Sequence, residues 1–159
     1  MEKEIMQKNL SIINTIKGEL PSLSFIEIKN DILGKNYSLS VAYVDEKKSR
    51  EINKKYRKKN KPTNVLSFSL HQNEGELVLC PAVIKREAKS FNKTFRQFLG
   101  FLVIHGMLHL KGIRHGSIME KAENFYCKKY DKKYFSGHRR RISNYKSRSG
   151  RILKGRKKS

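Results

Sequence analysis

The stretch Thr94–Gly112, TFRQFLGFLVIHGMLHLKG, decides the fold of this chain. Its apolar part, Phe98 to Leu110, runs for about 13 residues, fewer than the roughly 20 that a membrane-spanning helix needs, and it contains two histidines. Such a segment predicts a long helix that is buried inside a domain. Gly112 is the expected helix end, because glycine readily takes the left-handed conformation that closes a helix.

Shorter periodic segments on both sides of this helix predict the rest of the fold. Strands are expected at 10–17, 37–44, 65–70 and 75–80, and helices at 25–33 and 46–58, from Pro81 onward, and at 94–112 and 117–134. The residues up to Asn9 are mostly polar or charged and are expected to be frayed. The pattern predicts one α/β (α+β) domain over residues 1–135, with a mixed sheet of about four strands packed by about five helices.

Local patterns add detail to these helices. Ser24 followed by Glu27 predicts a capping box at the first helix, and Asp45 is expected to cap the second. Ile52 and Tyr56 lie one turn apart in the second helix, and both are expected to face inward. The last helix is expected to pack through Ala122, Phe125, Tyr126 and Tyr130.

The charge of the chain is unusual. The sequence has 36 Lys and Arg against 14 Asp and Glu, a net charge of +22, which favours a polyanionic partner, either nucleic acid or an acidic membrane surface. Residues 136–159 contain ten Lys or Arg and no acid, which predicts a disordered basic tail outside the domain. We favour an RNA-binding arm, because Tyr145 and the arginines offer stacking as well as charge. The alternative is a solvated tail that only keeps the protein soluble.

Targeting and redox signals are sparse. The N-terminal residues Met1–Glu4 lack the apolar core of a signal peptide, and no segment is long enough to cross a bilayer. The two cysteines, Cys80 and Cys127, provide no disulfide framework. Cys80 lies in an apolar run and is expected in the core. These features predict a cytoplasmic protein that does not bind a membrane.

Three of the five histidines fall within eleven residues, in the segment HGMLHLKGIRH at 105–115. On a helix, His105 and His109 project from one face, one turn apart, and a turn at Gly112 brings His115 back to the same point. Three neutral nitrogens leave a fourth position of Zn²⁺ open, as in a catalytic rather than a structural site. The ion lowers the pKa of its bound water towards neutrality, which supplies a hydroxide nucleophile. The alternative, core histidines without a metal, is disfavoured by their number and spacing.

The same histidine spacing occurs in the metzincin proteases. Those enzymes need a glutamate directly after the first histidine as general base, and this chain has Gly106 there. No acidic residue occurs between Glu87 and Glu120, so no carboxylate is expected near the histidines. A peptidase is therefore disfavoured, and a negatively charged substrate is favoured over a neutral amide. The other histidines, His71 and His138, are expected in solvent.

Three sequence blocks resemble one known family. The segment 105–115 resembles H-G-x-L-H-L-x-G-x-D-H, a signature of the YbeY family of bacterial rRNA maturation endoribonucleases. Residues 53–68, NKKYRKKNKPTNVLSF, are similar to the family's N-x-x-Y-R-x-K-x-K-P-T-[DN]-V-L-S-F, and residues 75–81, GELVLCP, to its G-D-I-x-I-C/S-P. The blocks follow the family order and extend the resemblance over about residues 37–130.

The resemblance implies a zinc-dependent endoribonuclease that prefers single strands. It implies action in the 3′ maturation of precursor 16S rRNA and in ribosome quality control, with RNA, the small ribosomal subunit and its proteins as partners and with no DNA. The three metal ligands of the family map onto His105, His109 and His115. Its functional arginine maps onto Arg57, which would clamp the scissile phosphate. Ser67 and Asn64 lie in the matching block, and a structural role is expected for both.

One position departs from the family pattern. The acidic residue before the third histidine is Arg114 here, which removes a carboxylate but offers a cation that binds phosphate. Glu76 in place of the family's aspartate is a milder change. Three hypotheses stay open: a metal-dependent ribonuclease with Arg57 and Arg114 at its catalytic site, an rRNA-binding assembly factor with little catalytic power, and, least favoured, a metalloprotease.

Overall fold

The computed structural model describes residues 3–18 and 23–135. The expected basic tail at 136–159, with His138 and Tyr145, lies outside the described residues. The elements in chain order are β1 (Lys3–Gln7), β2 (Leu10–Asn14), α1 (Phe25–Ile32), β3 (Ser38–Tyr43), α2 (Glu46–Arg57), β4 (Val65–His71), β5 (Glu74–Leu79), α3 (Pro81–Ser90), α4 (Phe95–Leu110), α5 (Ser117–Tyr130) and the short π-helix η1 (Asp131–Phe135).

The strands form one mixed sheet, as the sequence pattern predicts. In the described part of the chain it has five strands in the order β1-β2-β3-β5-β4. The inner pairs β2–β3 and β3–β5 are parallel, and the outer pairs β1–β2 and β4–β5 are antiparallel. The predicted fold class is therefore confirmed, with one strand more than the four expected.

The additional strand is β1, in the segment that the sequence analysis expects to be frayed. It pairs with β2 from Lys3 opposite Asn14 to Gln7 opposite Leu10, and Asn9 turns the hairpin at a positive φ of 61°. The sequence pattern of a half-buried strand is absent here, since the apolar side chains of β1 are not buried: Ile5 is 50% exposed and Met6 is 73% exposed. Backbone pairing with β2, rather than side-chain burial, holds this edge strand in place.

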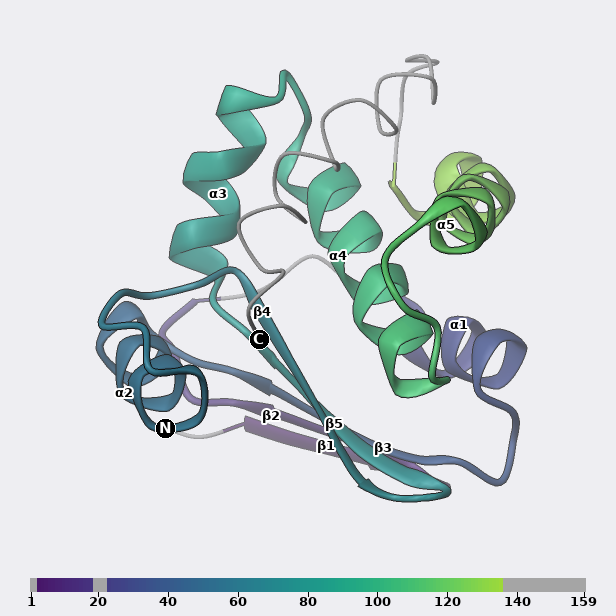
Figure 1. Ribbon diagram of the computed structural model, residues 1–159, viewed down its shortest axis with the longest axis horizontal. Coiled ribbons are helices and arrows are strands. Elements are labelled where there is room, and N and C mark those ends of the chain that lie inside the picture. Colours follow the sequence, from purple (N-terminus) through teal and green to yellow (C-terminus); the bar gives the residue numbers. More distant parts are fainter. Residues whose placement is uncertain (1–2, 19–22, 136–159) are drawn as a thin grey trace.

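Helix α4 is the central helix, as predicted. From Gln97 to Leu110 every residue except His109 is buried, and α4 contacts α1, α3, α5, β4 and β5. Figure 1 shows α1, α3 and α4 on one face of the sheet and α5 packed on α4. Thr94 and Gln97 cap its N-terminus reciprocally in a capping box. Within residues 3–18 and 23–135, no helix is both long and apolar enough to cross a membrane.

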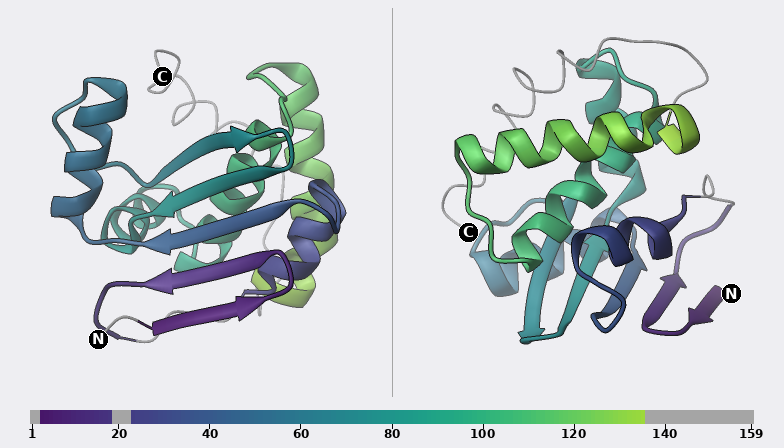
Figure 2. Two further views of the ribbon diagram at one scale, coloured as in Figure 1. Left: turned by 90° about the horizontal axis from the view of Figure 1, so that it is seen from below. Right: turned by 90° about the vertical axis from the view of Figure 1, so that its right-hand side faces the viewer.

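The opposite face of the sheet carries a smaller apolar cluster. It consists of Val44, Leu66 and Val78, against which Ile52 of α2 and Phe68 of β4 pack. Figure 2 (left) shows the sheet in front of α4 and α5, with α2 beside one end of the strands. Asp45 caps α2 as predicted, since its side chain accepts a hydrogen bond from the Lys48 backbone N–H at 2.8 Å.

Three expectations about helix faces and caps are wrong. Ser24 precedes α1, but its side chain makes no capping hydrogen bond, because its ψ of 75° departs from the extended backbone that a capping residue adopts. Tyr56 is 59% exposed, because it contacts Phe68 at the rim of the cluster while most of its side chain stays in solvent. Phe125 is 61% exposed, because α5 buries the stripe Met119, Glu123, Cys127 and Tyr130 instead.

Candidate metal centre and its cavity

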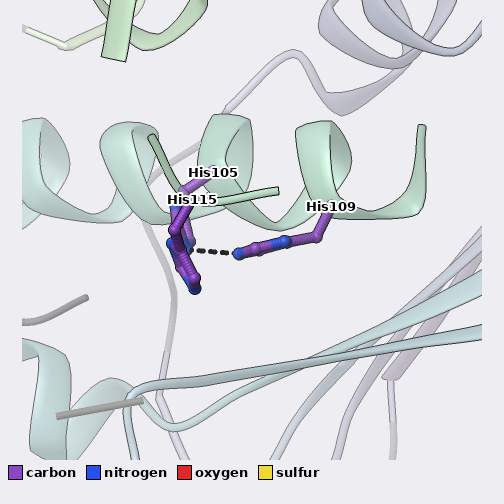
Figure 3. Close-up of side chains that lie close together, drawn as sticks. All are labelled: His105, His109 and His115. Atoms are coloured by element: carbon purple, nitrogen blue, oxygen red, sulfur yellow. Dashed lines mark hydrogen bonds between the residues drawn. The ribbon is translucent and has the colours of Figure 1, made fainter. Parts of the chain in front are cut away.

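Three histidines converge on one point beside α4. His105 and His109 lie one turn apart on this helix, and His115 follows it in the chain. One nitrogen from each ring lies within 4.8 Å of the others, and the Nε2 atoms of His105 and His109 are 3.0 Å apart. Figure 3 shows the ring of His109 directed at the rings of His105 and His115. The structure therefore brings together the three residues that the spacing predicts.

The turn at Gly112 is what returns His115 to the helix. Gly112 has a φ of 97°, the left-handed region expected from the sequence. Its N–H donates to the His109 carbonyl at 2.9 Å, and the Ile113 N–H donates to the Leu108 carbonyl at 3.0 Å. These two bonds form a Schellman motif, which satisfies the last carbonyls of α4 and reverses the chain.

The three imidazoles fit a divalent transition metal. A tetrahedral zinc ion with Zn–N bonds of about 2.0–2.1 Å holds two ligand nitrogens about 3.3 Å apart, close to the 3.0 Å between His105 Nε2 and His109 Nε2. The His105 ring is buried, and His109 and His115 are half-buried. The cluster is therefore held in the core on the side of His105 and is accessible to a substrate on the side of His109 and His115.

The accessible side opens into a cavity of about 700 Å³. The three histidines lie in its wall together with residues from α2, β4 and α4 and with Arg114; the wall consists of Tyr56, Arg57, Val65, Ser67, Phe68, Ser69, His105, Gly106, His109, Leu110, Arg114 and His115. None of these described residues is acidic, and two are arginines. The cavity therefore has the charge of an anion-binding site.

Comparison with known proteins identifies the family. The family described as endoribonuclease YbeY matches residues 4–133. The chain belongs to the YbeY family. An endoribonuclease YbeY from Lactobacillus helveticus is 38% identical over 108 residues, which cover 57% of this chain and 62% of the relative, and one from Buchnera aphidicola is 40% identical over 116 residues, which cover 64% and 73%. The chain thus aligns with less than two thirds of the Lactobacillus protein.

A solved structure agrees with this family assignment. The solution structure of a Thermotoga maritima protein matches with a TM-score of 0.53 and 30% identity, over 68% of this chain and 79% of that chain. The match to the YbeY family covers the described elements from β1 to α5 and into η1. The resemblance stated from three sequence blocks is confirmed, and it extends further towards the N-terminus than those blocks do.

Both arginines predicted at the YbeY site line the cavity. Arg57 is the last residue of α2 and is half-buried, and burial lowers the pKa of its guanidinium below the ordinary value. Arg114 is exposed beside His115. Among the described residues, neither arginine forms an ion pair. Because a guanidinium group is a cation with several N–H donors, both are available to an anionic substrate.

The two polar residues of the matching block have different surroundings. Ser67 is half-buried and lines the cavity. Asn64 is buried behind it, where its side chain donates to Glu87 and accepts from the Val65 backbone N–H at 2.6 Å. These bonds agree with the structural role expected of Asn64.

One carboxylate at this site was not predicted from the sequence. Glu123 of α5 is buried, and an oxygen of its side chain lies 3.5 Å from Nδ1 of His105. Burial raises the pKa of Glu123 to about 8, and the charge of Glu120 acts in the same direction. The expectation that no carboxylate lies nearby is therefore wrong for the buried side of His105, although it is right for the cavity wall.

The position of a metzincin general base is closed by packing. An ideal Cβ on Gly106 lies 2.7 Å from Cδ2 of Leu77 and 3.7 Å from Cγ2 of Val65. Leu77 is fully buried in β5, so any side chain at residue 106 requires the packed Leu77 side chain to shift. The glycine lets α4 approach β5 closely next to His105. Peptidase chemistry that depends on that glutamate is thus disfavoured by space as well as by sequence.

Proposed function

We propose that this chain is a metal-dependent endoribonuclease that hydrolyses single-stranded RNA, with zinc as its metal. The observation that carries the proposal is the convergence of His105, His109 and His115 in a cavity whose charged wall residues are arginines. Relatives that carry the name endoribonuclease YbeY support it. We propose precursor 16S rRNA as the substrate, in 3′ maturation and in ribosome quality control, and the small ribosomal subunit and its proteins as partners.

The three histidines would hold the ion through neutral ring nitrogens. When bound, zinc supplies Lewis acidity, which polarises a phosphoryl oxygen and makes water a stronger nucleophile at neutral pH. A cation bound at the histidines would favour the ionised form of Glu123. That form favours the His105 tautomer that carries its hydrogen on Nδ1, and this tautomer leaves the Nε2 lone pair for the ion.

The arginines bind and orient the phosphodiester. The guanidinium of Arg57 presents a planar fork of N–H donors, which matches two oxygens of one phosphate. Because it is half-buried at the end of α2, little side-chain freedom is lost when it binds. It stabilises the charge that develops on the phosphoryl oxygens in the transition state. Arg114 is more exposed and adds attraction for the strand at the mouth of the cavity.

A second candidate function rests on Arg114. It occupies the position of the family's acid, so this chain lacks a carboxylate that would assist proton transfer at that point. The second candidate is therefore an rRNA-binding assembly factor with little catalytic power. The substitution Arg114→Asp separates the two roles: it raises the cleavage rate if the missing acid limits the reaction, and lowers it if Arg114 binds phosphate.

Cleavage of a short single-stranded RNA, labelled at one end, tests the proposal. We expect full-length protein to cut it, a chelator to stop the reaction, and zinc to restore it. His109→Ala should abolish cleavage, whereas His71→Ala, which alters an exposed histidine outside the cavity wall, should leave it unchanged. RNA binding without chelator-sensitive cleavage would instead support the assembly factor, and hydrolysis of casein would support the protease.

A further inference from the structure

An aromatic pair, the exposed Tyr56 and the half-buried Phe68, lies in the wall of the metal cavity. Tyr56 on α2 and Phe68 on β4 form an edge-to-face contact, with ring centroids 5.1 Å apart and an angle of 61° between the ring planes. Tyr56 is 59% exposed. It directly precedes Arg57, and Phe68 lies between Ser67 and Ser69, all of which line the metal cavity. The ring of Tyr56 is therefore accessible next to the proposed phosphate-binding group.

The pair is also the boundary of a second cavity. This cavity measures about 410 Å³ and lies between α2 and the outer strands; its wall consists of Lys48, Glu51, Ile52, Lys55, Tyr56, Phe68, Leu70, Glu76 and Val78. Tyr56 and Phe68 are common to both walls. Leu70, at 49% exposure, extends the apolar surface along β4. A ligand that occupies the metal cavity therefore reaches aromatic surface at its edge.

The charges of the two cavities differ. The metal cavity has two arginines and no acid in its wall, whereas the second has two lysines and two glutamates, with Lys48 Nζ 3.9 Å from Glu51. Lys55 Nζ lies 5.2 Å from the centroid of the Tyr56 ring. The first cavity therefore suits a phosphate, and the second suits a neutral group that stacks on a ring. A nucleotide with an unpaired base joins these two kinds of group covalently.

We propose that Tyr56, supported by Phe68, is the stacking platform for one unpaired base of the RNA strand whose phosphate is bound in the metal cavity. The inference rests on the proposed function and deepens it. A base must leave its duplex before an aromatic side chain can stack on it, so this contact selects single-stranded substrate. It provides affinity without base identity, because every base has a π-face.

A cycle that removes either partner of the stack tests the inference. One set of RNAs carries a single abasic ribonucleotide at successive positions around the cleaved bond, and kcat/KM is measured for full-length wild type and Tyr56→Ala. We expect Tyr56→Ala to lose about 5- to 100-fold on intact RNA, and one abasic position to cost wild type a similar factor. When Tyr56→Ala acts on the RNA that is abasic at that position, the combined loss should be smaller than the product of the two single losses. At every other abasic position the combined loss should equal that product.

Two variants serve as controls. Tyr56→Phe keeps the ring and should lose several-fold less than Tyr56→Ala. Phe125→Ala removes a comparably exposed ring on α5, outside both cavity walls, and should behave as wild type. Thermal unfolding of each variant shows whether it is folded, and a surface position such as Tyr56 should tolerate alanine.

The outcomes separate this inference from the proposed function. Suppose that wild type cleaves RNA. If Tyr56→Ala then cleaves every RNA as well as wild type, or if its loss multiplies with the loss at every abasic position, Tyr56 is not a stacking platform and the nuclease proposal stands. The apolar surface is then one for a protein partner. If wild type cleaves no RNA, the nuclease proposal fails, and the same cycle measured as RNA dissociation constants still decides the stacking. Equal affinity of wild type and Tyr56→Ala would then refute it.

Discussion

The carboxylate of Glu123 lies 3.5 Å from Nδ1 of His105, on the side of the imidazole opposite to Nε2, which faces His109. The two side chains are only 4% and 2% exposed, so water does not screen their interaction effectively. They come from α5 and α4, two packed helices. Glu123 is thereby placed to set both the orientation and the tautomer of the most buried histidine of the cluster.

We predict that Glu123→Gln weakens zinc binding by about 10- to 100-fold, because a bound cation favours the ionised carboxylate and the amide keeps the shape of the side chain but cannot carry that charge. Competition with a chromophoric chelator measures this affinity directly. Asp131→Asn is the matched control, since it neutralises another buried acid that follows α5 in the chain. Equal affinity of Glu123→Gln and wild type, or an equal loss in Asp131→Asn, would contradict the role of Glu123.

This carboxylate also shows what the sequence could not predict. His105, His109 and His115 were predictable because a helical turn and one glycine fix their spacing within eleven residues. The contact of Glu123 depends on how α5 rotates against α4. The aromatic residues of α5 favoured a different buried stripe, and no hydrophobic pattern selects a stripe that contains a glutamate.

The sheet edges illustrate the same limit of local patterns. The inner strand β3 was predictable because its buried apolar residues alternate with smaller, more exposed ones, and β5 because it ends in a buried apolar run. The strand β1 was missed because its stabilisation comes from backbone pairing with β2, while Ile5 and Met6 stay exposed. Tyr56 was predicted to face inward from its spacing to Ile52, whereas it contacts Phe68 at the rim of the apolar cluster and stays exposed beside the metal cavity. Tertiary packing decided each of these cases.

A buried lysine provides a test of stability away from the site. Lys29 of α1 is fully buried, and its Nζ donates to the carbonyl oxygens of Gly34, Lys35 and Tyr37 at 3.1, 3.2 and 2.8 Å. Burial lowers its pKa. Because methionine fills similar space but leaves these carbonyls without that donor, we expect Lys29→Met to lower the free energy of unfolding by about 2–4 kcal/mol.

Urea unfolding measures this loss. Lys47→Met, which alters an exposed lysine of α2, is expected to change the unfolding free energy by less than about 0.5 kcal/mol. Zinc affinity should be the same in both variants, because neither lysine is near the histidines in the cavity wall. If Lys29→Met unfolds at the same urea concentration as Lys47→Met, the hydrogen bonds of Lys29 do not stabilise the fold.

The link between α1 and the end of α5 should make stability depend on pH. Asp31 accepts hydrogen bonds from Lys129 Nζ at 2.6 Å and from the Tyr130 hydroxyl at 2.5 Å. Burial acts to raise the pKa of Asp31, but these two bonds outweigh it, so the pKa lies below its ordinary value of 3.8. A carboxylate with a depressed folded-state pKa stabilises the fold above pH 3.8, and this contribution is lost as pH falls through the lower value.

We therefore expect Asp31→Asn to be less stable than wild type at pH 7, by about 0.5–1 kcal/mol because the pair is partly solvent-exposed. The difference should shrink as the pH is lowered below about 4, and it should be lost below the depressed pKa of Asp31. Chemical unfolding at a series of pH values measures both curves. Glu51→Gln, at an exposed and weaker pair with Lys48, should show no comparable difference. A gap between wild type and Asp31→Asn that stays constant down to pH 3 would exclude this linkage.

The basic residues at 136–159, which lie outside the described part of the structure, are predicted to add phosphate contacts to those of the cavity. Each contact releases counterions, so log K for single-stranded RNA falls with log salt by about 0.7 for each phosphate neutralised. Replacing the ten Lys and Arg of this segment by Gln should flatten that slope, and affinity should fall most at low salt. Replacing its five serines by Gln is the control, because it alters the same segment without removing charge. Fluorescence anisotropy at a series of salt concentrations measures the slope. If the neutralised variant keeps the slope of wild type, the segment does not contact phosphate, and basic residues of the domain, such as Arg57 and Arg114, supply the attraction.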